Sequence, residues 1–429
     1  MKTARIITGI VLAIFISVTS LAAQVVAVQG GTVHTLAGPD IEGGTVLIEN
    51  GLITAVGPNV SVPADALIID ASGLHVYPGM FDAMSRLGLT EVGAVDVTND
   101  YSELGNYNPH LLAMTAVHPA SEHIPVARAN GITHTVAAPN ARSGGIGGQG
   151  SLLHLDGWTV EEMVIQPSVG LVLSWPNMQT RSFDFATFTM TERSFREAKK
   201  EYEERIAELK SWIEGARQYK AAIEAGIAVE RDLKLEALVT VIDGELPFLI
   251  NANSERDING ALDFAGENNV RIVITGAREA WKVADRLAEE NVPVLLGPTQ
   301  SLPQGEDWGY DQVYAAPGQL YAAGVKFGFA SFNASASRNL PYEAASAVGF
   351  GLPYEEALRA ITINSAEILG VGDQLGTIEA GKIANIIVTD GDPLEIQTQI
   401  LHLVVNGLIS STDNKHKSLY EKYRARPER

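Results

Sequence analysis

The chain has 429 residues, of which 46% are apolar and 19% are charged, and its formal net charge at pH 7 is −20. Such a charge repels phosphate backbones and argues against binding of nucleic acid. The chain contains no cysteine, which excludes disulfides and thiolate metal ligands and leaves the fold to depend on its core.

Residues 1–23 have the pattern of a secretory signal peptide, with a basic start and a short apolar run that ends in small residues. The apolar run of about 17 residues is at the lower limit for spanning a bilayer, which leaves a retained membrane anchor as the alternative. We expect cleavage near Ala22 or Ala23, a periplasmic or secreted protein, and no membrane association after cleavage.

Strand patterns follow in residues 24–78 and return in residues 372–412. In the first segment, two β-rich runs flank Asn50 and Gly51, a dipeptide that is a strong hairpin signal. We expect the two segments to combine into one small composite β-sandwich that is built from both ends of the chain.

Between them, residues 79–371 alternate short apolar runs with helical patterns. The clearest apolar runs are 132–137, 169–174, 247–250, 271–274, 292–296 and 325–329. Buried strands that alternate with helices predict a parallel sheet of the α/β class. The number of units favours a closed (β/α)8 TIM-like barrel over an open sheet.

Two charged segments stand apart from this alternation. Residues 191–234 form a charged insertion in which Tyr202, Ile206, Leu209 and Ile213 recur at helical spacing. This insertion is either a long solvated helix with i,i+4 ion pairs or a lid or partner-binding arm over the barrel mouth. The tail, residues 413–429, is predicted to be a solvated terminal helix or frayed end.

A glycine-rich stretch, residues 145–150, matches the G-x-G-x-x-G pattern of dinucleotide sites. Such a site needs a helix directly after the loop, and residues 151–155 have a strand pattern instead. We therefore reject a nucleotide site and expect a mobile glycine-rich loop near the barrel mouth.

Four stretches resemble the amidohydrolase superfamily, in the order in which that superfamily has them. They are 43–51 (GGTVLIENG), 73–83 (GLHVYPGMFDA), 360–370 (AITINSAEILG) and 375–385 (LGTIEAGKIAN). The chain is most similar to the imidazolonepropionase-like, exported bacterial branch. The resemblance implies hydrolysis of C–N bonds, non-peptide or small peptide-like, with one or two divalent metal ions such as Zn²⁺ at the barrel mouth.

The same resemblance implies a set of metal ligands: His-x-His after strand 1, a carboxylated Lys on strand 4, His on strands 5 and 6, and Asp on strand 8. This chain instead has Met84 and Arg86 on strand 1, Asn251 on strand 5, Thr275 on strand 6 and Phe332 on strand 8. No Lys occurs between Lys2 and Lys199. Asn333, one residue further on, cannot act as a carboxylate base. We therefore expect a degenerate metal site, no bound metal and no other cofactor.

Several polar side chains near the predicted strand ends are candidates for lining a pocket. They are Asp82, Ser85, Arg86, Glu91, Asn251, Asn253, Thr275 and Asn333. The charge of Arg86 could replace that of the missing cation and hold a carboxylate or another anion. The alternative is that Arg86 forms an ion pair with Asp82, Glu91 or another nearby acidic residue.

His118, His123 and His134 lie close together in the sequence and could form a relocated metal or acid–base site. His118 and His123 are five residues apart, which does not place them on one face of a helix. The alternative is that these histidines are ordinary surface or capping residues.

Two functions remain open from the sequence. The first is a hydrolase of C–N bonds with a rearranged site. The second is a non-catalytic pseudo-amidohydrolase that binds a small-molecule ligand or serves as the partner subunit of an intact paralogue. Either could form a homo-oligomer, and the second could form a hetero-oligomer with that active paralogue.

Overall fold

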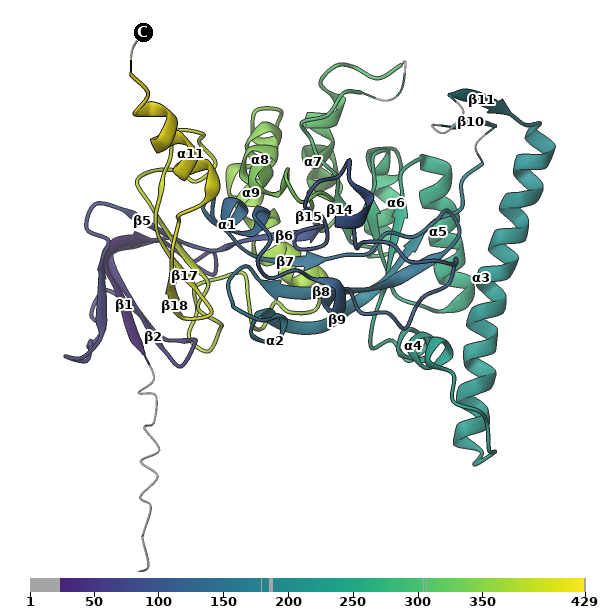
Figure 1. Cartoon of the computed structure of the whole chain (residues 1–429), viewed down its shortest axis with the longest axis horizontal. Coiled ribbons are helices and arrows are strands. Elements are labelled where there is room, and N and C mark those ends of the chain that lie inside the picture. Colours follow the sequence, from purple (N-terminus) through teal and green to yellow (C-terminus); the bar gives the residue numbers. More distant parts are fainter. Residues whose placement is uncertain (1–23, 179, 185–187, 304, 306, 428–429) are drawn as a thin grey trace, which may run out of the picture.

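The computed structural model describes residues 24–178, 180–184, 188–303, 305 and 307–427, and Figure 1 shows its two large sheets. The predicted signal peptide lies outside the described residues. One sheet forms the centre of the molecule, the other lies at one end of the long axis, and the longest helix lies at the opposite end (Figure 1). Within the described residues, no helix combines the length and the apolarity needed to cross a bilayer.

The central sheet has eight strands and curves into a nearly closed barrel. They are β6 (Met80–Ser85), β7 (Ile132–Ala137), β8 (Ile146–His154), β9 (Val164–Ser174), β12 (Phe248–Ala252), β13 (Ile272–Gly276), β14 (Val294–Leu296) and β15 (Phe327–Phe329). They follow the order β15-β14-β13-β12-β9-β8-β7-β6. Apolar side chains from both faces of these strands are buried, as expected of a sheet covered on both sides. The predicted α/β barrel is thus confirmed in its general form.

One strand departs from the predicted run of eight parallel units. Strand β8 is antiparallel to both neighbours, β7 and β9, whereas the other paired barrel strands are parallel. An antiparallel neighbour needs only a short connection, so no helix separates β7 from β8. The expectation of a β/α repeat at every position is wrong here, because a short apolar run does not encode the direction of its strand.

The glycine-rich stretch is part of β8 and is not a mobile loop, which corrects the prediction from the sequence. A Cβ atom on Gly147 would lie 2.3 Å from the Asn140 carbonyl oxygen, and one on Gly145 would lie 2.4 Å from that of Asn106. The loop around residues 106–112 also forms isolated β-bridges to this strand. The glycines therefore let two loops pack directly on the backbone of a buried strand.

The two ends of the barrel sheet meet between β15 and β6. The Phe332 N–H donates to the Met84 carbonyl oxygen at 2.8 Å. The Ser331 N–H donates to Asp82 Oδ1 at 2.9 Å, and the Ser331 hydroxyl donates to Asp82 Oδ2 at 2.5 Å. The seam is thus joined by one side chain as well as by the backbone.

The second sheet combines strands from both ends of the described chain. They are β1 (Val25–Val33), β2 (Ile41–Glu49), β3 (Leu52–Gly57), β4 (Leu67–Asp70), β5 (His75–Pro78), β16 (Ile386–Thr389), β17 (Ile400–Val405) and β18 (Leu408–Ser410). The sequence-distant strands meet where β5 pairs with β16 in antiparallel register. A separate cluster of buried aliphatic residues, among them Val28, Ile48, Ile69 and Val404, forms the core of this sheet.

Helices cover the outside of the barrel. They are α1 (His123–Arg128), α2 (Val160–Met163), α3 (Phe195–Glu224), α4 (Leu233–Ile242), α5 (Glu255–Asn268), α6 (Ala284–Glu289), α7 (Gln312–Ala322), α8 (Leu340–Val348), α9 (Tyr354–Ala360) and α10 (Ile363–Ile368). After the second sheet comes α11 (Lys415–Arg424), which buries none of its residues.

The charged insertion contains the helix α3, preceded by a two-stranded hairpin of β10 (Arg181–Asp184) and β11 (Thr189–Glu192). A capping box between Ser194 and Glu197 starts α3. Leu209 and Ile213 on its inner face belong to the barrel core, whereas i,i+4 pairs such as Lys199–Glu203 lie on its outer face. The helix therefore forms a solvated wall of the barrel domain.

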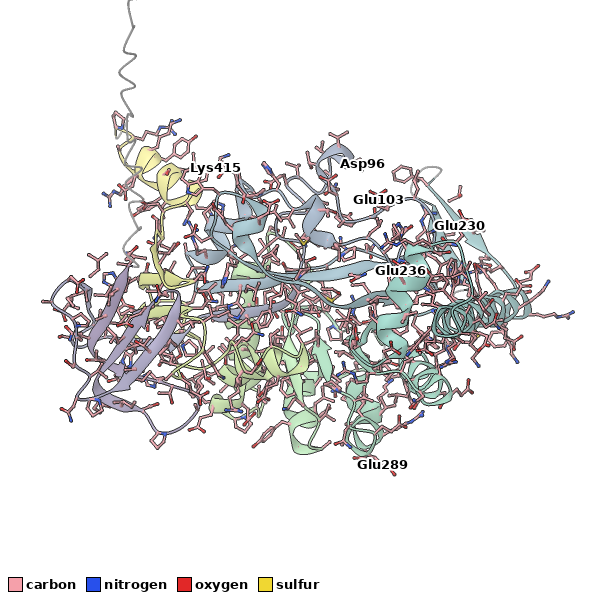
Figure 2. All side chains as sticks on the ribbon, turned by 90° about the horizontal axis from the view of Figure 1, so that it is seen from below. Asp96, Glu103, Glu230, Glu236, Glu289 and Lys415 are labelled. Carbon is pink, nitrogen blue, oxygen red and sulfur yellow. The ribbon has the colours of Figure 1, made fainter. Side chains whose placement is uncertain are left out.

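The acidic residues are concentrated at the periphery. Asp96, Glu103, Glu230 and Glu289 are exposed, and Figure 2 shows them with Glu236 away from the barrel centre. This distribution places the negative charge where it is solvated, which favours solubility and leaves the barrel mouth free of acidic residues.

Candidate functional site

A pocket of about 360 Å³ opens at the end of the barrel where the parallel strands terminate. Its lining, which we call the mouth pocket, comes from residues at or just after the C-terminal ends of β6, β7, β9, β12, β13, β14 and β15. In TIM-like barrels this end carries the ligand site, because loops from several strands converge there. Among the described residues, helix α3 contributes none to this lining.

The structure places most of the sequence-predicted pocket residues in this lining. They are Ser85, Arg86, Asn251, Asn253, Thr275 and Asn333, together with Met84 and Phe332, which stand where the resemblance implies metal-binding residues. Asp82 and Glu91 lie outside the lining. The residues come together because each one follows a parallel strand, and those strand ends meet at one edge of the barrel.

A row of polar side chains crosses the pocket floor. Ser174, Asn251 and Thr275 stand in register on the neighbouring strands β9, β12 and β13. The Asn253 amide nitrogen donates to Asn251 Oδ1 at 2.9 Å, which leaves the Asn251 nitrogen as the donor end of the pair. The floor therefore offers an amide donor between two hydroxyl groups.

Thr275 carries an unsatisfied hydroxyl. Its side chain is 0% exposed, and its Oγ1 has no hydrogen-bond partner among the described residues. A buried polar atom without a partner costs about 1–3 kcal/mol. Thr275 borders the mouth pocket, but its hydroxyl is closed off, so a bound molecule reaches it only if the groups that cover it move.

Arg86 and Arg278 are the charged residues of the lining, and both are cationic. The guanidinium carbon of Arg86 lies 3.9 Å from the centroid of the Tyr101 ring, a cation–π contact that fixes its position. Burial lowers the pKa of Arg86, opposed by the Tyr101 hydroxyl, but a guanidinium stays protonated.

The predicted alternative, an ion pair of Arg86 with Asp82 or Glu91, is not what the structure shows. The Asp82 carboxylate is bound by Ser331. Glu91 lies in the loop after β6, where its Oε2 accepts the Glu122 N–H at 3.4 Å and its carbonyl oxygen contacts the His123 ring at 2.9 Å. That loop turns toward α1, so it carries Glu91 away from Arg86.

Asp82 lies directly behind the pocket and is 0% exposed. Burial raises its pKa to about 6, although the two hydrogen bonds from Ser331 oppose the rise. Ser331 lines the pocket, so the carboxylate is separated from it by one hydroxyl group. Asp82 can therefore exchange a proton with a molecule in the pocket through the Ser331 hydroxyl group.

The mouth pocket does not fit the metal ions that the resemblance implies. Its lining offers amide, hydroxyl, thioether and guanidinium groups but no histidine, carboxylate or lysine. Zinc-type ions prefer imidazole, thiolate and carboxylate ligands, and an arginine repels any cation. Phe332, at the expected Asp position, has φ 51° and brings an aromatic ring to the pocket.

The structure does not gather His118, His123 and His134 into a ligand set. His118 is exposed, His123 contacts the Glu91 carbonyl oxygen, and His134 is 0% exposed with its Nδ1 2.7 Å from Thr133 Oγ1. Across the described part of the chain, no group of three or more histidines and carboxylates is arranged to hold a metal ion.

The sequence analysis missed four polar residues of the lining. They are Asn140, Ser174, Arg278 and Ser331. Ser174 ends the apolar run 169–174, and the other three lie two to four residues past an apolar run, where their polar character was the available signal. Arg278 is the consequential omission, because it is the second cation of the pocket.

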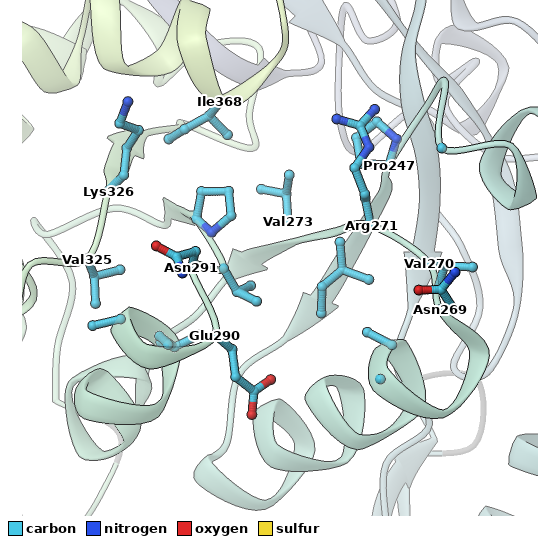
Figure 3. A pocket seen from close by; sticks show the side chains of 18 of the residues that line it. Pro247, Asn269, Val270, Arg271, Val273, Glu290, Asn291, Val325, Lys326 and Ile368 are labelled. Carbon is cyan, nitrogen blue, oxygen red and sulfur yellow. The ribbon is translucent and has the colours of Figure 1, made fainter.

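A hollow of about 930 Å³ lies at the opposite end of the barrel. Figure 3 shows it between Pro247, Arg271, Val325 and Lys326, which precede or begin the strands β12, β13 and β15. Lys326 is paired with Glu367 at 2.6 Å, and Arg271 donates to the Glu245 carbonyl oxygen at 2.9 Å. Its charged groups already have partners, and the barrel end that it occupies is the one associated with stability.

Comparison with known sequences gives one family and several relatives. The model of the amidohydrolase family matches residues 160–412. Amidohydrolase tasK from Hapsidospora irregularis is 25% identical over 403 residues, which cover 86% of this chain and 40% of that protein. The chain thus spans less than half the length of this relative. An imidazolonepropionase from Sphingopyxis alaskensis is 46% identical over 52 residues, 12% of this chain and 13% of that protein.

Comparison with solved structures agrees with the sequence matches. An amidohydrolase from Thermotoga maritima MSB8 superimposes with a TM-score of 0.76 at 26% identity, covering 90% of this chain and 99% of that chain. A molinate hydrolase superimposes with a TM-score of 0.56 at 19% identity, covering 91% of this chain and 96% of that chain, and shows a common fold alone.

Proposed function

We propose that this chain, which belongs to the amidohydrolase family, uses its barrel mouth to bind a small organic anion and does not carry out metal-assisted hydrolysis there. The family contributes the barrel and the position of the pocket. The residues of this chain decide the chemistry, since a fold alone does not determine a function.

One observation carries the proposal: the mouth pocket combines two arginines with hydrogen-bond donors and contains no acidic side chain. The whole chain has 51 acidic and 31 basic residues, so a purely cationic lining is opposite to its overall charge. The planar guanidinium of Arg86 suits a carboxylate, because two parallel N–H groups can bind both oxygens. Thr275 and Asn251 add hydroxyl and amide groups on the floor.

A second candidate function, hydrolysis of a C–N bond without a metal, is favoured by the contact between Asp82 and Ser331. A carboxylate with a pKa near 6 is suited to accept a proton at neutral pH. Asp82 would take the Ser331 hydroxyl proton while that oxygen attacks a substrate carbonyl carbon, and the departing amine would take the proton. Water would then release the acyl group from Ser331.

The anion-binding proposal predicts the behaviour of an Arg86→Gln variant. Titration calorimetry of the purified protein with sodium acetate should give a dissociation constant that rises at least about tenfold in the variant, since a charge-assisted pair becomes a neutral contact. The matched control is Arg142→Gln, which removes an arginine of the neighbouring loop that does not line the mouth pocket. Equal acetate affinity in the wild type and both variants would contradict the proposal.

The same preparations distinguish the second candidate. Release of an amine from N-acyl amino acids by the wild type, lost in Ser331→Ala, would establish hydrolysis as the function. Metal content by elemental mass spectrometry belongs to this experiment, and about one equivalent of zinc would overturn the interpretation of the donor set.

The remaining sequence predictions are carried forward as proposals. We propose that residues 1–23 direct export and are removed, which amino-terminal sequencing of the protein from its source would test. We propose an imidazolonepropionase-like origin, supported by the short local match. We also propose a composite β-sandwich from residues 24–78 and 372–412, and assembly with itself or with an active paralogue, which light scattering and co-purification would test.

A further inference from the structure

Helix α11 (Lys415–Arg424) lies at one edge of the molecule (Figure 1), and all ten of its residues are exposed. A helix of about this length is only marginally stable in water by itself, because most helical stability in proteins comes from packing. The Asn414 side chain caps the first turn by accepting the Lys417 N–H at 3.1 Å. The described part of the chain buries no face of α11. The helix therefore has the properties of one that docks on another surface.

The residues of α11 are sorted into distinct faces. His416, Leu419, Tyr420 and Tyr423 have the spacing i, i+3, i+4 and i+7, which places them on one side of the helix. Leu419 is 38% exposed, Tyr420 is 60% exposed and Tyr423 is 62% exposed. These four residues form a mainly apolar strip, which we call the α11 stripe, that faces solvent along the length of the helix.

Cationic side chains border the α11 stripe on both sides. Residues seven apart nearly align on an α-helix, so the four cations form two pairs. They are Lys417 and Arg424 along one edge and Lys415 and Lys422 along the other. The Arg424 guanidinium carbon lies 5.6 Å from the centroid of the Tyr420 ring, and Lys422 Nζ lies 5.6 Å from that of Tyr423. The cations thus lie against the rings of the stripe.

The charge of α11 is opposite to that of the whole chain. The helix has four Lys or Arg residues and one acidic residue, a net charge of +3 with histidine neutral, whereas the chain carries −20. The acidic residue, Glu421, lies on the face opposite the stripe and pairs with Arg424 at 3.0 Å. Lys415 pairs with Glu122 at 3.6 Å, and such exposed pairs are weak. Acidic groups more than about 8 Å away are largely screened at physiological salt, so α11 attracts an anionic surface.

An anionic lipid surface fits these features better than a protein does. Cations at both edges of the stripe would let the helix lie flat, with its rings among the headgroups and its cations at the lipid phosphates. Tyrosine suits this boundary, because its ring is apolar and its hydroxyl is polar. Three apolar side chains cover far less than the roughly 800 Å² that each partner contributes to a standard protein interface.

We propose that α11 docks this protein on anionic phospholipid bilayers, with the α11 stripe in the headgroup region and the four bordering cations against the phosphates. The proposal does not depend on the mouth pocket or its ligand. For α11 it replaces our expectation from the sequence that the chain has no membrane association after cleavage.

The test is co-sedimentation with lipid vesicles of the protein purified from its source, in the form in which the source produces it. One set of vesicles contains phosphatidylcholine alone, and the other contains equal amounts of phosphatidylcholine and phosphatidylglycerol. Each Lys or Arg near an anionic surface strengthens binding roughly fivefold. The net charge of +3 therefore predicts a preference of about a hundredfold for the anionic vesicles at low salt, and added salt should reduce it.

Variants assign this preference to α11. Lys417→Gln/Lys422→Gln should weaken binding to the anionic vesicles about twentyfold. The matched control is Lys199→Gln/Lys200→Gln, which makes the same change in net charge at exposed positions of α3 and should bind like the wild type. Tyr420→Ser/Tyr423→Ser should weaken binding severalfold and keep the salt dependence, because it removes the rings and leaves the cations. These α11 side chains are exposed, so the urea midpoint should not change.

Three outcomes would overturn the proposal. The first is no preference of the wild type for anionic vesicles. The second is an equal loss of binding in the α3 control, which would make the effect one of overall charge. The third is a dimer in light scattering that the α11 variants dissociate, without vesicle binding, because a second copy of the chain would then occupy the helix.

Discussion

Acidification from pH 6 to pH 4 is expected to destabilise the folded chain by about 3 kcal/mol, mainly through two buried histidines. His134 and His154 face each other across β7 and β8 and are 0% and 4% exposed. Burial lowers the pKa of His134 to about 3, and the neighbouring His154 lowers it further. Burial lowers the pKa of His154 to about 4, and the charge of Asp156 opposes this effect.

The hydrogen bonds explain why the charged forms are disfavoured. The Asn385 amide nitrogen contacts Nδ1 of His134 at 3.3 Å and Nδ1 of His154 at 3.4 Å. Asn385 Oδ1 already accepts the Asn406 N–H at 2.8 Å, which fixes the direction of the amide. A proton on either Nδ1 would face this amide donor, although Thr133 Oγ1, 2.7 Å from His134 Nδ1, can accept the proton of that ring, so burial is the main cause of the lowered pKa values.

The sign of the pH dependence follows from the lowered pKa values. The unfolded chain takes up protons on both histidines below about pH 6.5, whereas the folded chain resists until about pH 4 and pH 3. Each histidine thus costs up to about 1.4 kcal/mol per pH unit below 6.5. Asp82, whose pKa is raised to about 6, acts in the opposite direction and offsets roughly one of the two.

Urea unfolding at pH 7, 6, 5 and 4 measures this dependence. The double variant His134→Gln/His154→Gln should flatten the loss of unfolding free energy below pH 6. His118→Gln is the matched control, because this imidazole is exposed in the folded chain as well as in the unfolded one. If the unfolding free energy of the wild type does not change between pH 6 and pH 4, His134 and His154 are not both neutral in the folded chain.

Asp82→Asn is expected to stabilise the protein by up to about 3 kcal/mol at pH 8 and to have almost no effect at pH 4. The pKa of Asp82 is about 6 in the folded chain, against an ordinary value of 3.8, so the ionised carboxylate is disfavoured by about two pKa units. That penalty is present above pH 6 and disappears as the pH falls through 6 towards 3.8, where the carboxylate is protonated.

The amide can keep both contacts with Ser331. Its oxygen can accept the Ser331 N–H, and its nitrogen can donate to Ser331 Oγ, whose proton then goes to the Asn333 carbonyl oxygen at 2.9 Å. The measurement is the urea midpoint at pH 8 and at pH 4, with the exposed Asp65→Asn as a control for the change in net charge. A variant that is less stable at pH 8 would show that the charged seam stabilises the barrel.

A stabilising Asp82→Asn result would also bear on function. A buried carboxylate that destabilises the folded chain and lies next to a pocket is a feature of enzyme active sites. Such sites retain destabilising groups because the groups are needed for catalysis. Loss of amine release in this variant, despite higher stability, would favour the Asp82–Ser331 hydrolase. Unchanged or tighter anion binding with no turnover in either form would favour the binding function.

Much of the site could be predicted because parallel strands bring their C-terminal ends together. Arg86, Asn251 and Thr275 are far apart in the sequence, yet each one follows an apolar run and therefore reaches the same pocket. Glu91 is also close to a strand end, but its loop folds back onto α1. Proximity in sequence to a strand does not determine the direction of a longer loop.

Other features depended on contacts that the sequence does not display. Asp82 lies inside β6, and its role at the seam depends on Ser331, which follows β15 and lies beside it only in the folded chain. The reversal of β8 depends on pairing with both neighbours, which a local pattern cannot specify.

The glycines at the start of β8, Gly147 within the strand and Gly145 just before it, determine which substitutions this protein tolerates. Gly145 and Gly147 each leave less than 3 Å between an added methyl group and a backbone carbonyl oxygen, which cannot swing aside as a side chain can. Saturation mutagenesis should find these positions as intolerant as those of a catalytic centre. Among homologues that share this strand, the same glycines would be retained by purifying selection for packing, and a pattern similar to a cofactor motif would persist without any cofactor.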